Sequence, residues 1–190
     1  MKTMRSSVVR YIIYGQICFY TGLLACIVLK PHGLAANDGI SYYGVYRETV
    51  LPYVFALLGC AYFCIKAAEQ FTEAAFKLLK YAFSVIGLLI IGIMVTPDSL
   101  SQFMDGLHRA CGSSLFVVQL LLSGWFIVRL RYDWRAVGLT TLELAGGIAS
   151  FIYLSPAHGL LLQAQILFQL SFGALAIYAL KRLQADYRTS

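Results

Sequence analysis

Charged residues are scarce in this sequence of 190 residues, of which only 13% are Asp, Glu, Lys or Arg while 59% are hydrophobic. A soluble domain carries roughly 25% charged residues, so about half of the usual charge is missing. The apolar residues lie in runs of about 20, long enough for a helix to cross a hydrocarbon core of ~30 Å. The composition therefore excludes an ordinary soluble domain and predicts a polytopic membrane protein.

The motifs of several common chemistries are absent as well. The sequence holds no Gly-rich phosphate loop, no Walker-type sequence, no GxSxG and no HExxH, so the enzyme classes that these motifs identify are not indicated. The cysteines are odd in number and lie in or beside apolar runs, which argues against a disulfide framework and favours a packing role. They are Cys18, Cys26, Cys60, Cys64 and Cys111. The net charge of +6 comes from basic residues beside the apolar runs, where membrane topology uses them, so no nucleic-acid partner is expected.

The apolar runs predict an all-α protein, a single domain of six transmembrane helices. They cover residues 8–29, 49–68, 76–96, 110–129, 136–155 and 159–180. The first run is longer than the ~7–15 residues of a signal-peptide core, so it is predicted to be a membrane-spanning helix. Small residues recur at helical spacing in three runs and predict close helix packing. They are Gly15, Cys18, Gly22 and Cys26, then Ala56, Cys60, Cys64 and Ala68, then Ala145, Gly146, Ala149 and Ser150.

The basic residues predict the orientation. An even number of spans puts both termini on one side, together with twelve of the 15 Lys and Arg residues, and leaves Lys30, Arg47 and Arg109 on the other side. The positive-inside rule then makes both termini cytoplasmic. All four prolines also fall at span ends on the outer side, where a missing backbone N–H costs least. The expected location is a bacterial cytoplasmic membrane.

Polar side chains inside the predicted spans are candidates for function. Glu143 is the one acidic residue well inside a span, where an ionisable group is expensive. Two interpretations stay open: a proton relay, or a structural group that is paired with Lys80 or stays neutral and bonded to Gln16. Glutamines in the fourth and sixth spans are expected either to form interhelical hydrogen bonds, each worth ~0.6 kcal/mol, or to line a polar cleft among helices 4–6. These are Gln119, Gln163, Gln165 and Gln169.

All three histidines, His32, His108 and His158, fall on the predicted outer side. Coming from three different loops, they could meet around a zinc ion, which would activate water at the membrane surface. The other interpretation is that they are surface or pH-responsive histidines.

The first outer segment, residues 31–48, is polar and aromatic and reads PHGLAANDGISYYGVYRE. Its Asn-Asp-Gly predicts a turn, and Thr49 is expected to cap the helix that follows. Ser41 is expected to satisfy a backbone donor nearby, and the tyrosines to lie in the headgroup zone with their hydroxyls in water. The segment is predicted to be an ordered lid that either anchors the protein at the interface or recognises a lipid or partner. The residues expected to bind are Asp38, Ser41, Tyr42, Tyr43, Tyr46 and Arg47.

The same segment resembles a feature of the DRAM/Sfk-type six-helix membrane proteins and of the allied bacterial family of unknown function. In those families an ISxxG-like loop follows the first helix and leads into the second. The matching residues are Ile40, Ser41 and Gly44, followed by LPYVFALLG. The resemblance implies six spans with both termini inside and a link to lipid-anchor remodelling or membrane organisation, without a shared set of catalytic residues.

These features predict a non-catalytic multi-pass membrane protein that needs no cofactor. Its expected partners are membrane lipids, a membrane protein or a second copy of the chain, bound through the outer segment and the polar cleft. Two alternatives stay open. One is a metal-dependent hydrolase of lipids with zinc on the three histidines, and the other is a small proton-coupled transporter or channel that uses Glu143.

Overall fold

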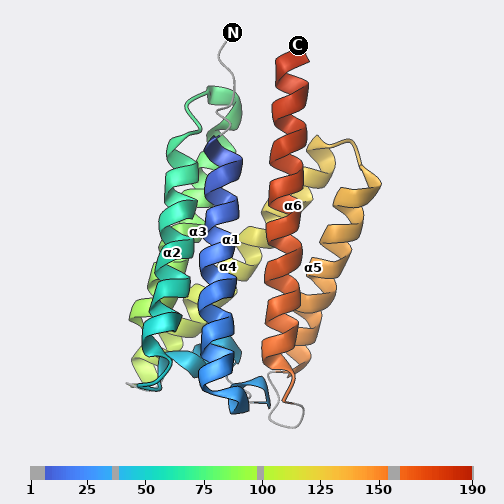
Figure 1. The fold of residues 1–190 in the computed structure, drawn as a ribbon. Coiled ribbons are helices and arrows are strands. Elements are labelled where there is room, and N and C mark those ends of the chain that lie inside the picture. Colours follow the sequence, from blue (N-terminus) through green and yellow to red (C-terminus); the bar gives the residue numbers. More distant parts are fainter. Residues whose placement is uncertain (1–6, 36–38, 98–100, 154–158, 190) are drawn as a thin grey trace.

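The computed structural model describes residues 7–35, 39–97, 101–153 and 159–189, and most of them lie in helices (Figure 1). The long helices are α1 Ser7–Leu29, α2 Val50–Glu69, α3 Lys77–Val95, α4 Gln102–Arg129, α5 Trp134–Tyr153 and α6 Leu161–Thr189. Three short 3₁₀-helices connect them: η1 Pro31–Ala35, η2 Gly39–Gly44 and η3 Ala74–Phe76.

The α-helices stand side by side and run alternately up and down, so that α1 begins and α6 ends at the same end of the bundle (Figure 1). We call this the inner end, and the outer end carries η1, η2 and the start of α4. All six α-helices belong to segments that are long and apolar enough to cross a membrane. The prediction of an all-α protein with six long apolar helices is therefore confirmed for the residues that the structure describes.

Two helices extend beyond the apolar runs. α4 begins at Gln102 instead of near residue 110, because the side chain of Ser101 accepts a hydrogen bond of 3.2 Å from the Met104 N–H and so caps the helix. His108 consequently lies inside α4 and not in a loop before it. α6 continues to Thr189, well past residue 180, and Figure 1 shows its last turns projecting beyond the other helices at the inner end. No Gly or Pro interrupts these turns, so the helix continues beyond its apolar part.

Small residues bring neighbouring helices together, as their spacing predicted. A Cβ atom on Gly22 of α1 would lie 2.6 Å from the Pro52 carbonyl oxygen and 2.7 Å from the Ala56 Cβ of α2. Gly146 of α5 lies as close to α6, because a Cβ atom on Gly146 would be 2.6 Å from the Phe168 backbone nitrogen. Such close approach matters here because lipid provides no hydrophobic driving force between helices.

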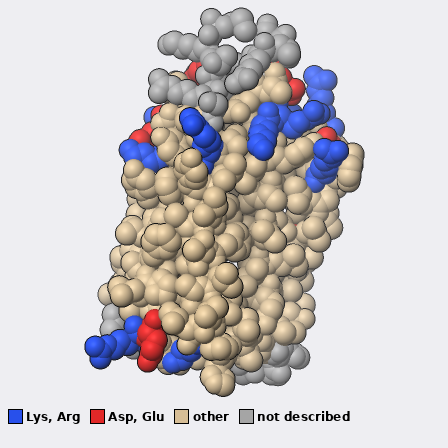
Figure 2. All heavy atoms as spheres, in the orientation of Figure 1, with Lys and Arg blue, Asp and Glu red and all other residues tan. Residues whose placement is uncertain are grey.

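Charge is confined to the two ends of the bundle on the face shown in Figure 2. Lys and Arg side chains gather there, more of them toward the inner end, and an uncharged band separates the two groups. This distribution suits a chain whose helices cross a bilayer.

Candidate functional site: an outer cap and the polar contacts beneath it

The outer end of the bundle is closed by an outer cap, which we define as residues 31–35 and 39–49. At its centre is Tyr43, whose side chain is 0% exposed. Its hydroxyl lies so close to Gly33 that a Cβ there would be only 2.5 Å away. Thr49 Oγ1 donates a hydrogen bond of 2.7 Å to the Tyr43 carbonyl oxygen. The cap is therefore a folded layer whose own side chains fill its interior.

Two predictions for this segment are wrong. The Tyr43 hydroxyl does not reach water: it is buried without a hydrogen-bond partner among the described residues, and this burial raises the pKa of Tyr43. Thr49 does not cap α2 with its side chain, because its hydroxyl bonds back to the cap. Both differences arise because the cap packs against the bundle instead of spreading in the headgroup zone.

The other aromatic residues lie at the rim of the cap. Tyr42 and Tyr46 are half-buried with ring centroids 4.7 Å apart, and the Lys30 Nζ atom lies 3.2 Å from the centroid of the Tyr46 ring. A cation over an aromatic face is attracted by the ring quadrupole, so Tyr46 ties the cap to the end of α1. Arg47 is exposed, and Asp38 lies outside the described residues.

α6 holds the cap from below. Gln165 Oε1 accepts a hydrogen bond of 2.8 Å from the Ile40 N–H, and Gln163 Nε2 donates one of 2.7 Å to the Leu34 carbonyl oxygen. Gly39 has a φ of +59°, and a Cβ there would collide with the Gln165 amide. Only glycine fits this position without strain. Gln165 therefore serves the cap, a role that neither interpretation of the glutamines predicted.

Ser41 joins the cap to α4. Its Oγ lies 2.7 Å from Nε2 of His108. The other ring nitrogen, Nδ1, lies 2.8 Å from the Thr96 carbonyl oxygen and 3.2 Å from that of Ile93. Ser41 and His108 are both half-buried. The prediction that Ser41 serves a nearby backbone donor is wrong, because its partner is a histidine on another helix.

Two further polar contacts lie deeper, between the last three α-helices. The amides of Gln119 on α4 and Gln169 on α6 exchange hydrogen bonds of 3.0 and 3.2 Å. One turn further along α4, Ser123 Oγ donates a hydrogen bond of 2.5 Å to Oε2 of Glu143 on α5. Glu143 is 0% exposed, and its Oε1 has no partner within the described part of the chain.

The partners predicted for Glu143 are wrong. Lys80 is exposed on α3, and the Gln16 amide lies against Gly173 of α6. The fold places Ser123 opposite the carboxyl group instead.

The interpretation of the glutamines as interhelical hydrogen-bonding groups fits Gln119 and Gln169, because the two amides satisfy each other. Their contact belongs to a line that begins at Ile40–Gln165, passes through Gln169–Gln119 and ends at Ser123–Glu143. Residues four apart on a helix share a face. Gln165 and Gln169 therefore lie on one face of α6, and Gln119 and Ser123 lie on one face of α4.

The structure brings no metal-binding group together in the part that it describes. His32 is exposed in η1, His108 faces Ser41, and His158 lies outside the described residues. Among residues 7–35, 39–97, 101–153 and 159–189, no three His, Cys, Asp or Glu side chains are arranged to hold a metal ion. The zinc alternative stays a prediction that depends on His158.

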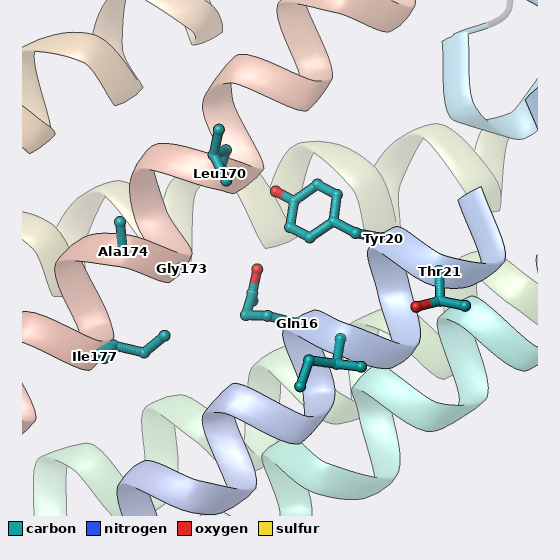
Figure 3. Close-up of a pocket in the computed structure, with 8 residues that line it drawn as sticks. Gln16, Tyr20, Thr21, Leu170, Gly173, Ala174 and Ile177 are labelled. Carbon is teal, nitrogen blue, oxygen red and sulfur yellow. The ribbon is translucent and has the colours of Figure 1, made fainter. Parts of the chain in front are cut away.

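A side groove lies between α1 and α6, in a region where we found no sequence motif. It has a volume of about 390 Å³ and is lined by Gln16, Ile17, Tyr20 and Thr21 of α1 and by Leu170, Gly173, Ala174 and Ile177 of α6. Figure 3 shows Gln16 and Tyr20 projecting from α1 toward α6 across this space. The Gln16 amide packs against Gly173, and the adjacent small residues Gly173 and Ala174 are the sequence signal that could have indicated the groove.

No protein-family model, no curated protein and no solved structure matches this chain. The resemblance to DRAM/Sfk-type proteins therefore stays a prediction that rests on Ile40, Ser41 and Gly44.

Proposed function

We propose that this chain is a multi-pass membrane protein that holds a membrane lipid by one acyl chain in the groove between α1 and α6. The position of the groove supports this most directly. It opens sideways, since its lining includes the exposed side chains of Ile17 and Leu170. The middle of the bundle around it is an uncharged band on the face shown in Figure 2.

An acyl chain suits the groove in size and chemistry. A volume of about 390 Å³ falls within the range of roughly 300–1,000 Å³ that is usual for small-molecule sites. At this depth in a bilayer the surrounding medium is hydrocarbon and not water, so lipid chains are what fills a hollow on the side of a bundle. The lining is mostly apolar, and its polar members are Gln16, Tyr20 and Thr21.

The outer cap favours entry from the side. It is fastened to α1 through Lys30 and Tyr46, to α4 through Ser41 and to α6 through Gln165. A lipid would therefore exchange laterally with the bilayer and not pass through the outer end. In this proposal both termini are cytoplasmic, in keeping with the excess of basic residues at the inner end.

Photo-crosslinking tests the proposal. The protein is reconstituted in vesicles that contain a phospholipid with a diazirine on one acyl chain, and labelled peptides are identified by mass spectrometry. We expect labels on residues 16–21 and 170–177. Ala174→Phe fills the groove and should reduce this labelling about tenfold, which corresponds to ~1.4 kcal/mol of binding free energy.

Ala145→Phe is the matched control, because Ala145 is exposed on α5 and is not among the residues that line the groove. It should leave the labelling unchanged. Labels spread evenly over all the helices, or equal labelling of the groove in both variants and the wild type, would contradict the proposal.

A further inference from the structure

We propose that Ser41 and His108 form a nucleophile and general-base pair at the outer end of the bundle, which cleaves a carboxylic ester of a membrane lipid. The pair is separate from the groove between α1 and α6, and the proposal does not depend on lipid binding there. It rests on three hydrogen-bond distances and on the depth at which the pair lies.

The tautomer of His108 follows from the groups around its ring. Nδ1 lies 2.8 Å from the Thr96 carbonyl oxygen and 3.2 Å from the Ile93 carbonyl oxygen. Carbonyl oxygens only accept hydrogen bonds, so Nδ1 carries the ring proton. In the neutral ring Nε2 is then an acceptor, and the Ser41 hydroxyl, 2.7 Å away, donates to it. A histidine oriented in this way is poised to take the proton of a serine nucleophile.

Ser41 is anchored on both sides and still accessible. On one side the Ile40 N–H is bonded to Gln165 of α6, and on the other Thr49 holds the Tyr43 carbonyl oxygen. These contacts fix the backbone from which the hydroxyl projects. Because Ser41 and His108 are only half-buried, a substrate can approach the pair from the outer surface.

The depth of the pair indicates its substrate. His108 is the seventh residue of α4, about 9 Å along the axis at a rise of ~1.5 Å per residue. The interfacial layer of a bilayer is roughly 5–8 Å thick on each side. With the first residue of α4 placed at the outer surface of this layer, the pair lies near the boundary between headgroups and acyl chains. Phe103 and Leu107, which are 75% and 41% exposed, present apolar surface on the same turns of α4. Ester groups of membrane lipids lie at this boundary.

The reaction balances with these two side chains and water. Ser41 Oγ forms a bond to the ester carbonyl carbon while its proton moves to His108 Nε2. The bond to the alcohol part of the lipid breaks, and that oxygen takes the proton from Nε2. Water then attacks the acyl-serine, loses its proton to Nε2 and releases a carboxylic acid, and the proton returns to Ser41 Oγ.

The simpler alternative is that the hydrogen bond only tethers the cap to α4. A tether needs a donor and an acceptor, and the side-chain oxygen of a glutamine in place of His108 can still accept from Ser41. A nucleophile needs a base that removes its proton, and a glutamine amide does not do so at neutral pH. His108→Gln therefore separates the two roles.

The test uses the whole protein in nanodiscs of phosphatidylcholine and phosphatidylglycerol, with an alkyl fluorophosphonate as the probe. An activated serine forms an Oγ–P bond to this probe and releases fluoride. We expect peptide mapping to find the label on Ser41. His108→Gln should slow labelling about 100-fold, the low end of what a positioned general base contributes. Ser41→Ala should abolish it, whereas Ser113→Ala, at an exposed serine of α4, should not.

Labelling of the wild-type protein alone also tests the proposal. An activated Ser41 reacts faster than Ser113, so equal labelling of the two serines in folded wild type overturns the proposal even where His108→Gln does not fold. Equal labelling rates in the wild type and in folded His108→Gln overturn it too. Release of fatty acid from the nanodisc phospholipids by the wild type, and its loss in Ser41→Ala, would support lipid cleavage. If folded wild-type protein releases no fatty acid, lipid cleavage is overturned.

Discussion

An acidic side chain without exposed surface has to find its hydrogen bonds inside the protein, and Glu143 receives one from Ser123. A charge at this depth in a bilayer is costly, so the surroundings of this carboxyl group affect the stability of the whole bundle. The structural interpretation of Glu143 and the transporter alternative differ in what they require of it. The first requires only its shape and its hydrogen bond, and the second requires its proton.

We expect Ser123→Ala to lower the free energy of unfolding by about 1–3 kcal/mol, because it leaves a buried carboxyl oxygen unpaired. Glu143→Gln keeps an oxygen for the Ser123 hydroxyl and removes the ionisable group, so the change should stay below ~1 kcal/mol. Reversible unfolding in mixed detergent micelles gives both values. Ser113→Ala, on the exposed part of α4, is the control and should stay within ~0.5 kcal/mol. A larger loss for Glu143→Gln than for Ser123→Ala would contradict the structural interpretation, in which only the shape and the hydrogen bond of Glu143 matter.

At the scale of elements, the outer cap depends on α6, because Gln165 accepts the hydrogen bond of the Ile40 N–H. Gln165→Ala removes this acceptor and should cost the cap about 1–2 kcal/mol of local stability. Such a change corresponds to a factor of roughly 5–30 in the equilibrium between the folded and the locally open cap. Hydrogen–deuterium exchange of residues 39–44 should accelerate by this factor. Gln102→Ala, at an exposed glutamine of the outer end, is the control, and unchanged exchange in Gln165→Ala would show that the hydrogen bond to Gln165 does not hold the cap.

A second prediction at this scale concerns the contact between α1 and α2. Gly22→Ala places a Cβ only 2.6 Å from the Pro52 carbonyl oxygen, so the two helices have to move apart, at a cost of about 1–3 kcal/mol. Gly124→Ala makes the same change on α4, where nothing lies within 4 Å of the new Cβ. Better helix propensity should then stabilise the protein by up to ~1 kcal/mol. Equal unfolding free energies for the two variants would mean that α1 and α2 are not held by this contact.

For the molecule as a whole, the features that were predictable from sequence are those that depend on short stretches. An apolar run is long enough to span a bilayer or it is not, so the long apolar helices could be predicted. The pairing of Gln119 with Gln169 depends on the register of α4 against α6, which packing along both helices sets. The contact between Ser41 and His108 likewise joins segments far apart in the chain, so no motif spacing revealed it. The groove between α1 and α6 arises where side-chain volume is missing, and only Gly173 and Ala174 hint at it.

The charges at the outer end of the bundle bear on its predicted orientation. Of the three basic residues there, Lys30 lies on the Tyr46 ring and the Arg109 Nε donates to Asp105 Oδ1 at 2.8 Å, while Arg47 is exposed. The inner end carries most of the other basic residues, and moving each charge outward against the membrane potential costs ~2.3 kcal/mol per 100 mV. We therefore expect the outer cap outside the cell and both termini in the cytoplasm.

Single cysteines at exposed basic positions test this orientation. A membrane-impermeant maleimide should label Arg47→Cys in intact cells, and it should label Lys181→Cys at the inner end only after the membrane is opened. The wild type supplies the background, because its own cysteines are buried or half-buried. The reverse pattern would put the outer cap, with Ser41 and His108, in the cytoplasm and contradict the positive-inside prediction. Labelling of both positions in intact cells would contradict a bundle that crosses a sealed membrane.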